Sequence, residues 1–307
     1  MFAGKQGFFL FKERLRCLGK SCIAASTKAP TSRDRLTRSY SGFMGAPLSE
    51  LRALNKEYTE KFQRQLDNAS FALVEIDDPK LLKSLRGGIK EASKLTSFRF
   101  PPTDEPIVYN DRQKAAFRSL FDIGIVCLKA VLHDKPSHPR PPVQEKLETF
   151  KKALEEVENV SLFESDPNEP FQNENQPFAQ SFFNLFNYNH GALNAHVDRS
   201  LLTVVFIKEA EYQMKPPTVL WIEDKDGSWH SADDVAANYD APPTRVVVMA
   251  GEQLADWYRA AKHSARVRPY EKDLDNAHLR RDPKTPASGN RLSAALILRH
   301  GDSAVGR

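Results

Sequence analysis

The spacing of apolar residues divides the chain into a helical part and a part made of strands. Between 47 and 165, apolar residues recur mainly at intervals of three and four, which predicts amphipathic helices. One apolar run in this part, 71–77, predicts a short strand instead. Helices are expected over 48–66, 78–95, 112–133 and 143–158.

From 180 onwards the pattern changes to short runs rich in β-branched and aromatic residues, separated by turn residues such as Asp226-Gly227. Many short strands with turns between them are typical of a sandwich or jelly roll. The sequence therefore predicts an α+β protein with a mostly helical region at 47–165 and a β-rich core at 180–307. Strands are expected at 181–189, 201–208, 217–223, 245–250 and 292–299, and around His263.

The first 46 residues have a composition of their own. They contain nine Lys or Arg and two acidic residues, a net charge of +7, whereas the whole chain is +4, so the remainder is about −3 (4 − 7). A segment rich in Arg and Ser and poor in acids is typical of a transit peptide. We expect a mitochondrial location, with cytoplasm or plastid as alternatives. A basic N-terminus without a targeting role is the other interpretation.

The composition of the remaining residues excludes several partners. Because the positive charge belongs to 1–46, a nucleic-acid-binding surface is not expected on the rest of the chain. No apolar run approaches the length of about 20 residues that a membrane span needs. The three cysteines form no disulfide or zinc pattern, and Cys127 lies in an apolar stretch that predicts a core position. A small molecule is the expected partner, and the oligomeric state stays open.

Candidate metal ligands stand before the strand expected at 201–208. On an extended chain, His196 and Asp198 would point to the same face and could hold one side of a metal ion. A second histidine would complete the 2-His-1-carboxylate triad of non-haem iron oxygenases. His263, 65 residues after Asp198 (263 − 198), follows an apolar segment and is the preferred candidate. His278, which lies in a run of charged residues, is its rival.

A second pair of polar residues opens the last expected strand. Arg291 and Ser293 also share one strand face by the same alternation. A guanidinium and a hydroxyl side by side can bind a carboxylate through several hydrogen bonds. The sequence thus offers a metal site and an anion site within its β-rich part.

The order His-x-Asp, distal His, Arg-x-Ser resembles the 2-oxoglutarate- and Fe(II)-dependent dioxygenases of the isopenicillin-N-synthase-like superfamily. HVDRSLLTVVF, the hairpin with Gly227 and Trp229, VVVMAGEQL and SGNRLSAALILR carry this likeness, which extends over about 180–300. Two features depart from it. ADWYRAAK replaces the family's Asn-Gly turn before the distal histidine, and the 28 residues from His263 to Arg291 (291 − 263) contain an expected insertion at 269–290.

The resemblance implies a double-stranded β-helix (jelly roll) core with an N-terminal helical region and a metal at its open end. It also implies Fe(II), with 2-oxoglutarate and dioxygen as cosubstrates, and the oxidation of a small organic substrate coupled to succinate formation. No catalytic residue beyond the metal ligands is expected. The implied iron ligands are His196, Asp198 and His263, and the implied 2-oxoglutarate contacts are Arg291, Ser293 and Tyr188.

Three alternatives remain open from the sequence. The chain could be an iron oxidase of this superfamily that does not use 2-oxoglutarate, as some members are. It could be a non-catalytic binding relative, an interpretation favoured by the altered residues before His263. The same ligands could also hold zinc or manganese. The identity of the substrate cannot be read from these residues.

Overall fold

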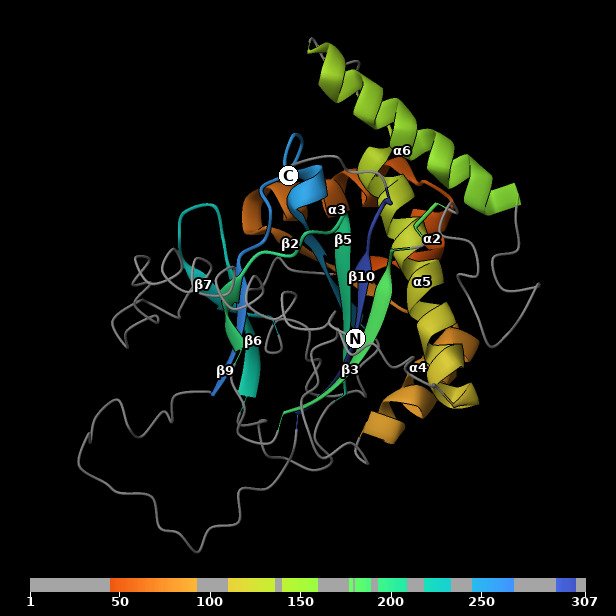
Figure 1. Cartoon of the computed structure of the whole chain (residues 1–307), viewed down its shortest axis with the longest axis vertical. Coiled ribbons are helices and arrows are strands. Elements are labelled where there is room, and N and C mark those ends of the chain that lie inside the picture. Colours follow the sequence, from red (N-terminus) through yellow and green to blue (C-terminus); the bar gives the residue numbers. More distant parts are fainter. Residues whose placement is uncertain are drawn as a thin grey trace, which may run out of the picture. The chain divides into compact units, whose positions relative to one another are not determined.

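The computed structural model describes residues 45–92, 110–135, 140–159, 177–178, 180–188, 193–208, 218–232, 245–267 and 291–301 (Figure 1). All of them belong to one compact unit, Leu36–Arg307. Two segments predicted from the sequence lie outside the described residues: the insertion at 269–290 and the N-terminal segment at 1–46, apart from its last two positions.

The strands of the described residues form two sheets, one of six strands in the order β1-β2-β8-β5-β10-β3 and one of four in the order β4-β9-β6-β7. Every pairing among them is antiparallel except that of β1 with β2. The bounds are β1 Ala46–Pro47, β2 Phe71–Glu75, β3 Phe182–Tyr188, β4 Leu193–His196, β5 Leu202–Lys208, β6 Thr218–Glu223, β7 Trp229–Ser231, β8 Arg245–Ala250, β9 His263–Val267 and β10 Arg291–Leu298.

The helices follow the predicted periodicity with one correction. The single helix expected over 48–66 is two helices, because the chain breaks at Leu54, whose φ is 51°, and Asn55 then caps the second helix by accepting the Glu57 N–H. None of the described helices is long and apolar enough to cross a membrane. The helices are α2 Leu48–Arg52, α3 Lys56–Ala69, α4 Pro79–Ala92, α5 Asp111–Leu132 and α6 Pro141–Asn159, with a 3₁₀ helix η1 at Glu252–Leu254.

Alternation along β5 shows how the six-stranded sheet is buried on both faces. Val204 and Phe206 belong to the core shared with the helices, whereas Val205 and Ile207 belong to a second core that also contains Leu220 of β6. The second core therefore joins the inner faces of the two sheets. The mixture of helices and sheets predicted from the sequence is confirmed.

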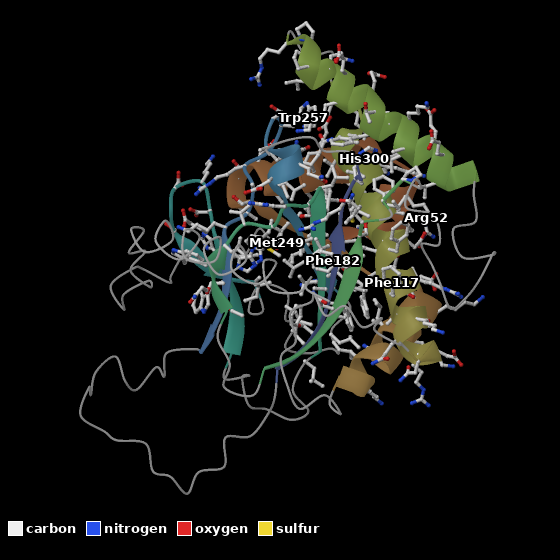
Figure 2. All side chains as sticks on the ribbon, in the orientation of Figure 1. Arg52, Phe117, Phe182, Met249, Trp257 and His300 are labelled. Atoms are coloured by element: carbon white, nitrogen blue, oxygen red, sulfur yellow. The ribbon has the colours of Figure 1, made fainter. Side chains whose placement is uncertain are left out.

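Helix α5 supplies much of the core on the helical side. Its Phe117, labelled in Figure 2, packs against Phe183 of β3 with ring centroids 5.6 Å apart. Cys127 is fully buried, as its apolar surroundings predicted. Gly124 faces the sheet, and a Cβ at this position would come within 2.9 Å of Leu296. Glycine therefore permits the close approach of helix and sheet.

The strand predicted at 71–77 is β2, and it joins the six-stranded sheet beside β8. Phe71 and Leu73 lie in the core between the sheets. The region at 47–165 therefore contributes a strand and core side chains to the sheet that carries β5, β8 and β10.

Candidate metal centre

Two histidines that are far apart in sequence stand opposite each other at the end of the β4–β9 pair. His196 is the last residue of β4, His263 is the first residue of β9, and the two are cross-strand partners. Their ring centroids are 4.3 Å apart. Antiparallel pairing thus brings together side chains separated by 67 residues (263 − 196).

Asp198 joins the two histidines from the connection between the sheets. The strand β4 ends at His196, and Asp198 lies two residues further along, in the connection to β5. The two side chains lie close together, as the alternation along an extended chain predicted. Asp198 Oδ1 lies 3.6 Å from His196 Nε2, and Asp198 Oδ2 lies 3.5 Å from His263 Nε2.

One ligand atom from each of these three residues lies within 4.8 Å of the others. His263 is 6% exposed, and His196 and Asp198 are partly buried. Within the part of the chain that the structure describes, no other three His, Cys, Asp or Glu residues gather in this way.

Backbone carbonyls fix the tautomer of both imidazoles. His196 Nδ1 lies 2.8 Å from the Asn194 carbonyl oxygen, and His263 Nδ1 lies 3.0 Å from that of Ala261. A carbonyl can only accept, so each Nδ1 carries the proton and donates it. In the neutral rings, both Nε2 lone pairs then face the acceptor oxygens of Asp198. Metal-ligating histidines commonly donate their second ring N–H in this manner.

The charges of the cluster point to a cation. Burial alone would raise the pKa of Asp198, but the two histidines and the Thr203 hydroxyl outweigh burial and lower it to about 2. Burial lowers the pKa of His263, and the Asp198 charge offsets this only in part. Burial also acts to lower the pKa of His196, yet Asp198 and the Asn194 carbonyl raise it overall. Converging acceptor atoms around one carboxylate repel one another unless a proton or a metal ion lies between them.

The donor set fits a divalent transition metal. Two neutral imidazoles and one carboxylate on one side of an ion form the 2-His-1-carboxylate arrangement, which leaves coordination positions for other ligands. His196, Asp198 and His263 are therefore the residues that would hold such an ion.

The turn after β8 holds the backbone of the Asp198 segment. The N–H groups of Gly251, Glu252 and Gln253 donate to the carbonyl oxygens of Leu201, Asp198 and Ser200, each at 2.9 Å. This turn is the start of η1 and forms the GEQL end of the segment VVVMAGEQL noted in the sequence.

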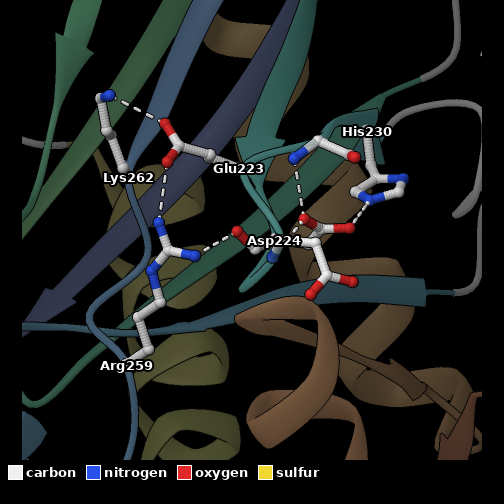
Figure 3. Close-up of polar contacts among 7 residues, drawn as sticks. Glu223, Asp224, His230, Arg259 and Lys262 are labelled. Carbon is white, nitrogen blue, oxygen red and sulfur yellow. Dashed lines mark hydrogen bonds and ion pairs between the residues drawn. The ribbon is translucent and has the colours of Figure 1, made fainter. Parts of the chain in front are cut away.

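The segment ADWYRAAK before His263 is anchored to several elements. Glu223 of β6 accepts from Arg259 Nη2 at 2.7 Å and from Lys262 Nζ at 2.8 Å, and Arg259 also donates to the Asp224 carbonyl (Figure 3). Tyr258 donates to the Val131 carbonyl of α5 at 3.2 Å. Long-range contacts thus hold the chain that enters β9.

The β6–β7 turn beside this segment is ordered by Asp224. Its carboxylate accepts from the N–H groups of Asp226 and Ser228 and lies 2.6 Å from His230 Nε2 (Figure 3). Gly227 adopts a φ of 79°, which favours glycine at this position of the turn. Burial would raise the pKa of Asp224, but His230 and the turn N–H groups lower it.

The backbone of the two residues predicted to bind an anion, Arg291 and Ser293, lies in β10. Arg291 is the first residue of β10 and stands opposite Tyr188 of β3, while Ser293 is 1% exposed and stands opposite Ile207. The side chains of Arg291 and Tyr188, and the whole of the rival His278, lie outside what the structure describes.

Sequence reasoning missed Thr203, Ser200 and Gly251 around Asp198. Thr203 Oγ1 lies 2.6 Å from Asp198 Oδ2, and Ser200 Oγ lies 3.2 Å from Thr203 Oγ1. A single polar residue inside the apolar run LLTVVFI was the available signal for Thr203, since a hydroxyl in a buried strand needs a partner.

No family model matches the chain, and no curated protein does. Among solved structures, it is similar to a protein of Caulobacter crescentus described as belonging to the 2OG-Fe(II) oxygenase family (14% identity, 84% of this chain, 87% of that chain, TM-score 0.48). It is also similar to JOX2 in complex with 2OG, Fe and JA (12% identity, 91% of this chain, 82% of that chain, TM-score 0.48). A third similar structure is the dioxygenase for auxin oxidation 1 of Arabidopsis thaliana in complex with 2-oxoglutarate (16% identity, 80% of this chain, 88% of that chain, TM-score 0.39).

The chain thus resembles 2OG-Fe(II) oxygenase structures, as its motifs indicated.

Proposed function

We propose that this protein is a 2-oxoglutarate- and Fe(II)-dependent dioxygenase with a double-stranded β-helix core that oxidises a small organic molecule. The observation that carries the proposal is the convergence of His196 Nε2, His263 Nε2 and the Asp198 carboxylate, with both Nδ1 protons committed to backbone carbonyls. The Nε2 lone pairs and the carboxylate oxygens are all acceptors, and a bound cation would satisfy them together.

The residues of the chain would divide the work as follows. The two imidazoles and Asp198 hold the ion on one side, and their charge of −1 leaves a bound Fe(II) site near +1. Fe(II), when bound, couples the reduction of dioxygen to decarboxylation of 2-oxoglutarate, giving succinate, carbon dioxide and an oxidised substrate. Arg291 and Ser293 are proposed to hold the distal carboxylate of 2-oxoglutarate, and Tyr188 is a further candidate contact.

The test uses the full chain under anaerobic conditions. Fe(II) is added first and 2-oxoglutarate second, and the weak visible charge-transfer band of the chelated cosubstrate is recorded. We expect the band in the wild type and in His278→Ala, and its loss in His196→Ala and His263→Ala. Because His278 is the rival ligand, its variant is the matched control.

Other outcomes would favour the alternatives. Iron binding without a band would favour an oxidase that does not use 2-oxoglutarate. Failure to bind iron would favour a non-catalytic relative. Arg291→Lys should lower the affinity for 2-oxoglutarate and leave the affinity for iron unchanged, because lysine cannot make the bidentate contact of a guanidinium.

A mitochondrial location, directed by 1–46, is a further part of the proposal, with cytoplasm or plastid as alternatives. It is supported by the basic, Ser-rich composition of that segment. Imaging the chain with a C-terminal fluorescent protein, beside a version in which the arginines of 1–46 are replaced by glutamine, tests it. Equal distributions would count against targeting.

A further inference from the structure

Among the described residues, the Asp198 carboxylate has one hydrogen-bond donor that is not a candidate metal ligand. Thr203 Oγ1 lies 2.6 Å from Asp198 Oδ2, the oxygen that also faces His263 Nε2. Thr203 is 3% exposed and lies on β5, in the six-stranded sheet, whereas both histidines belong to the four-stranded sheet. A hydroxyl at this distance from a carboxylate forms a short, charge-assisted hydrogen bond.

The direction of this hydrogen bond determines the next one. An ionised carboxylate only accepts, so Thr203 donates its single proton to Asp198. The Thr203 oxygen can then only accept from Ser200 Oγ, which lies 3.2 Å away. Because Ser200 is fully buried, water does not compete for its hydroxyl. The two hydroxyls therefore form a directed chain from Ser200 through Thr203 to Asp198.

Ser200 is itself held by the turn after β8. A Cβ on Gly251 would overlap both the carbonyl oxygen and the hydroxyl of Ser200, so the glycine backbone lies directly against this residue. The Gln253 N–H also donates to the Ser200 carbonyl at 2.9 Å. The start of the hydroxyl chain thus has little freedom to move.

We propose that Thr203, oriented by Ser200, is a positioning residue that holds the Asp198 carboxylate facing the Nε2 atoms of His196 and His263 before metal binds. The inference rests on the metal site proposed above and deepens it. Without the hydroxyl, the carboxylate would have to be ordered at the moment of binding. Partners that orient a ligand in this way typically change metal affinity by about 10- to 100-fold.

The experiment measures Mn(II) affinity of the full chain by counting free Mn(II) with electron paramagnetic resonance. We expect Thr203→Val to bind Mn(II) at least about tenfold more weakly and Thr203→Ser to bind it like the wild type. Ser200→Ala should fall between them, because Thr203 keeps its proton for Asp198 but loses the donor that orients it. Rescue by serine distinguishes the hydroxyl from the shape of the side chain.

Thr59→Val is the matched control. Thr59 is 2% exposed, and its hydroxyl has no hydrogen-bond partner among the residues that the structure describes, so its removal should leave Mn(II) affinity unchanged. Wild-type affinity in folded Thr203→Val, or loss of affinity in Thr203→Ser equal to that in Thr203→Val, would overturn the inference. If Thr203→Val does not fold, Ser200→Ala decides, and its wild-type affinity would overturn the inference. A wild type that binds no Mn(II), Fe(II) or Co(II) would instead overturn the metal site itself.

Discussion

Asp198 and His263 face the same point but are held in place by different kinds of contact. Asp198 is held by the Thr203 hydroxyl, which Ser200 contacts in turn, and its segment accepts three backbone N–H groups of the turn after β8. His263 follows a segment held by ion pairs to Glu223 and by a tyrosine bonded to α5. One candidate ligand is thus held by hydroxyl and backbone hydrogen bonds, and the other by ion pairs and a tyrosine hydrogen bond on the segment that leads to it.

The largest effect is expected from a substitution in the turn that holds the Asp198 segment. Gly251→Ala places a Cβ on the Ser200 hydroxyl and carbonyl, so the turn and the Asp198 segment must separate. We expect a loss of about 1–3 kcal/mol in the free energy of unfolding, as for other overpacked sites, together with weaker Mn(II) binding. Chemical denaturation and Mn(II) titration measure the two effects.

Gly87→Ala provides the control for that substitution. No described atom lies within 4 Å of a Cβ at Gly87, and the residue is inside α4, so alanine should stabilise the protein by up to about 1 kcal/mol. Similar losses in both variants would contradict the assigned role of Gly251.

On the His263 side, Glu223→Gln removes the charge shared by Arg259 and Lys262. The carboxylate is 13% exposed and its partners are about one-third exposed, so we expect a loss of about 1 kcal/mol after allowing for solvent screening. The difference from the wild type should shrink in 1 M NaCl, because salt screens partly exposed ion pairs. An unchanged difference would show that packing, not charge, holds this segment.

Glu252→Gln is the control for Glu223→Gln, because it removes the same charge at an exposed position. Glu252 is exposed and faces Arg199 at 3.8 Å, so its substitution should change the free energy of unfolding by less than about 0.5 kcal/mol.

Tyr258→Phe sharpens the comparison by removing one neutral contact on the His263 side. The hydroxyl donates to the Val131 carbonyl, and the side chain is 2% exposed. We expect a loss of about 1 kcal/mol that does not depend on salt. Thermal unfolding at low and high NaCl tests this, and a salt-dependent loss would argue against a neutral hydrogen bond.

The smallest effect concerns the pH dependence of the β6–β7 turn. The pKa of Asp224 is lowered in the folded state, so its contribution to stability is present above the unfolded pKa of about 3.9 and is lost as the pH falls through the folded value. The stability difference between the wild type and Asp224→Asn should therefore be constant near neutrality and shrink below about pH 4. A difference that grows on acidification would refute this assignment.

Much of the fold followed from local pattern, because helices and strands have distinct periods. The strand expected at 201–208 is β5, and the Asp226-Gly227 turn lies between β6 and β7. The break at Leu54 was missed because the apolar spacing of 48–66 continues across it.

The site was harder to predict, because its members meet through sheet pairing. No spacing rule places His263 opposite His196. The apolar segment before His263 and the resemblance to a known family made it the preferred third ligand. The alternation argument predicted that His196 and Asp198 project together, and their side chains lie 3.6 Å apart although β4 ends before Asp198. Thr203 was missed because threonine is common in strands whether or not its hydroxyl forms a hydrogen bond.

Because Asp198 lies between the sheets, a metal ion bound at the proposed site would also link the two sheets. Both histidines come from the four-stranded sheet, and Asp198 is tied through Thr203 to the six-stranded sheet. Metal binding free energy is then also free energy that keeps the two sheets together, in proportion to the logarithm of metal concentration over its dissociation constant. Supply of the metal that fills the proposed site would thereby affect how long the protein survives unfolding and proteolysis.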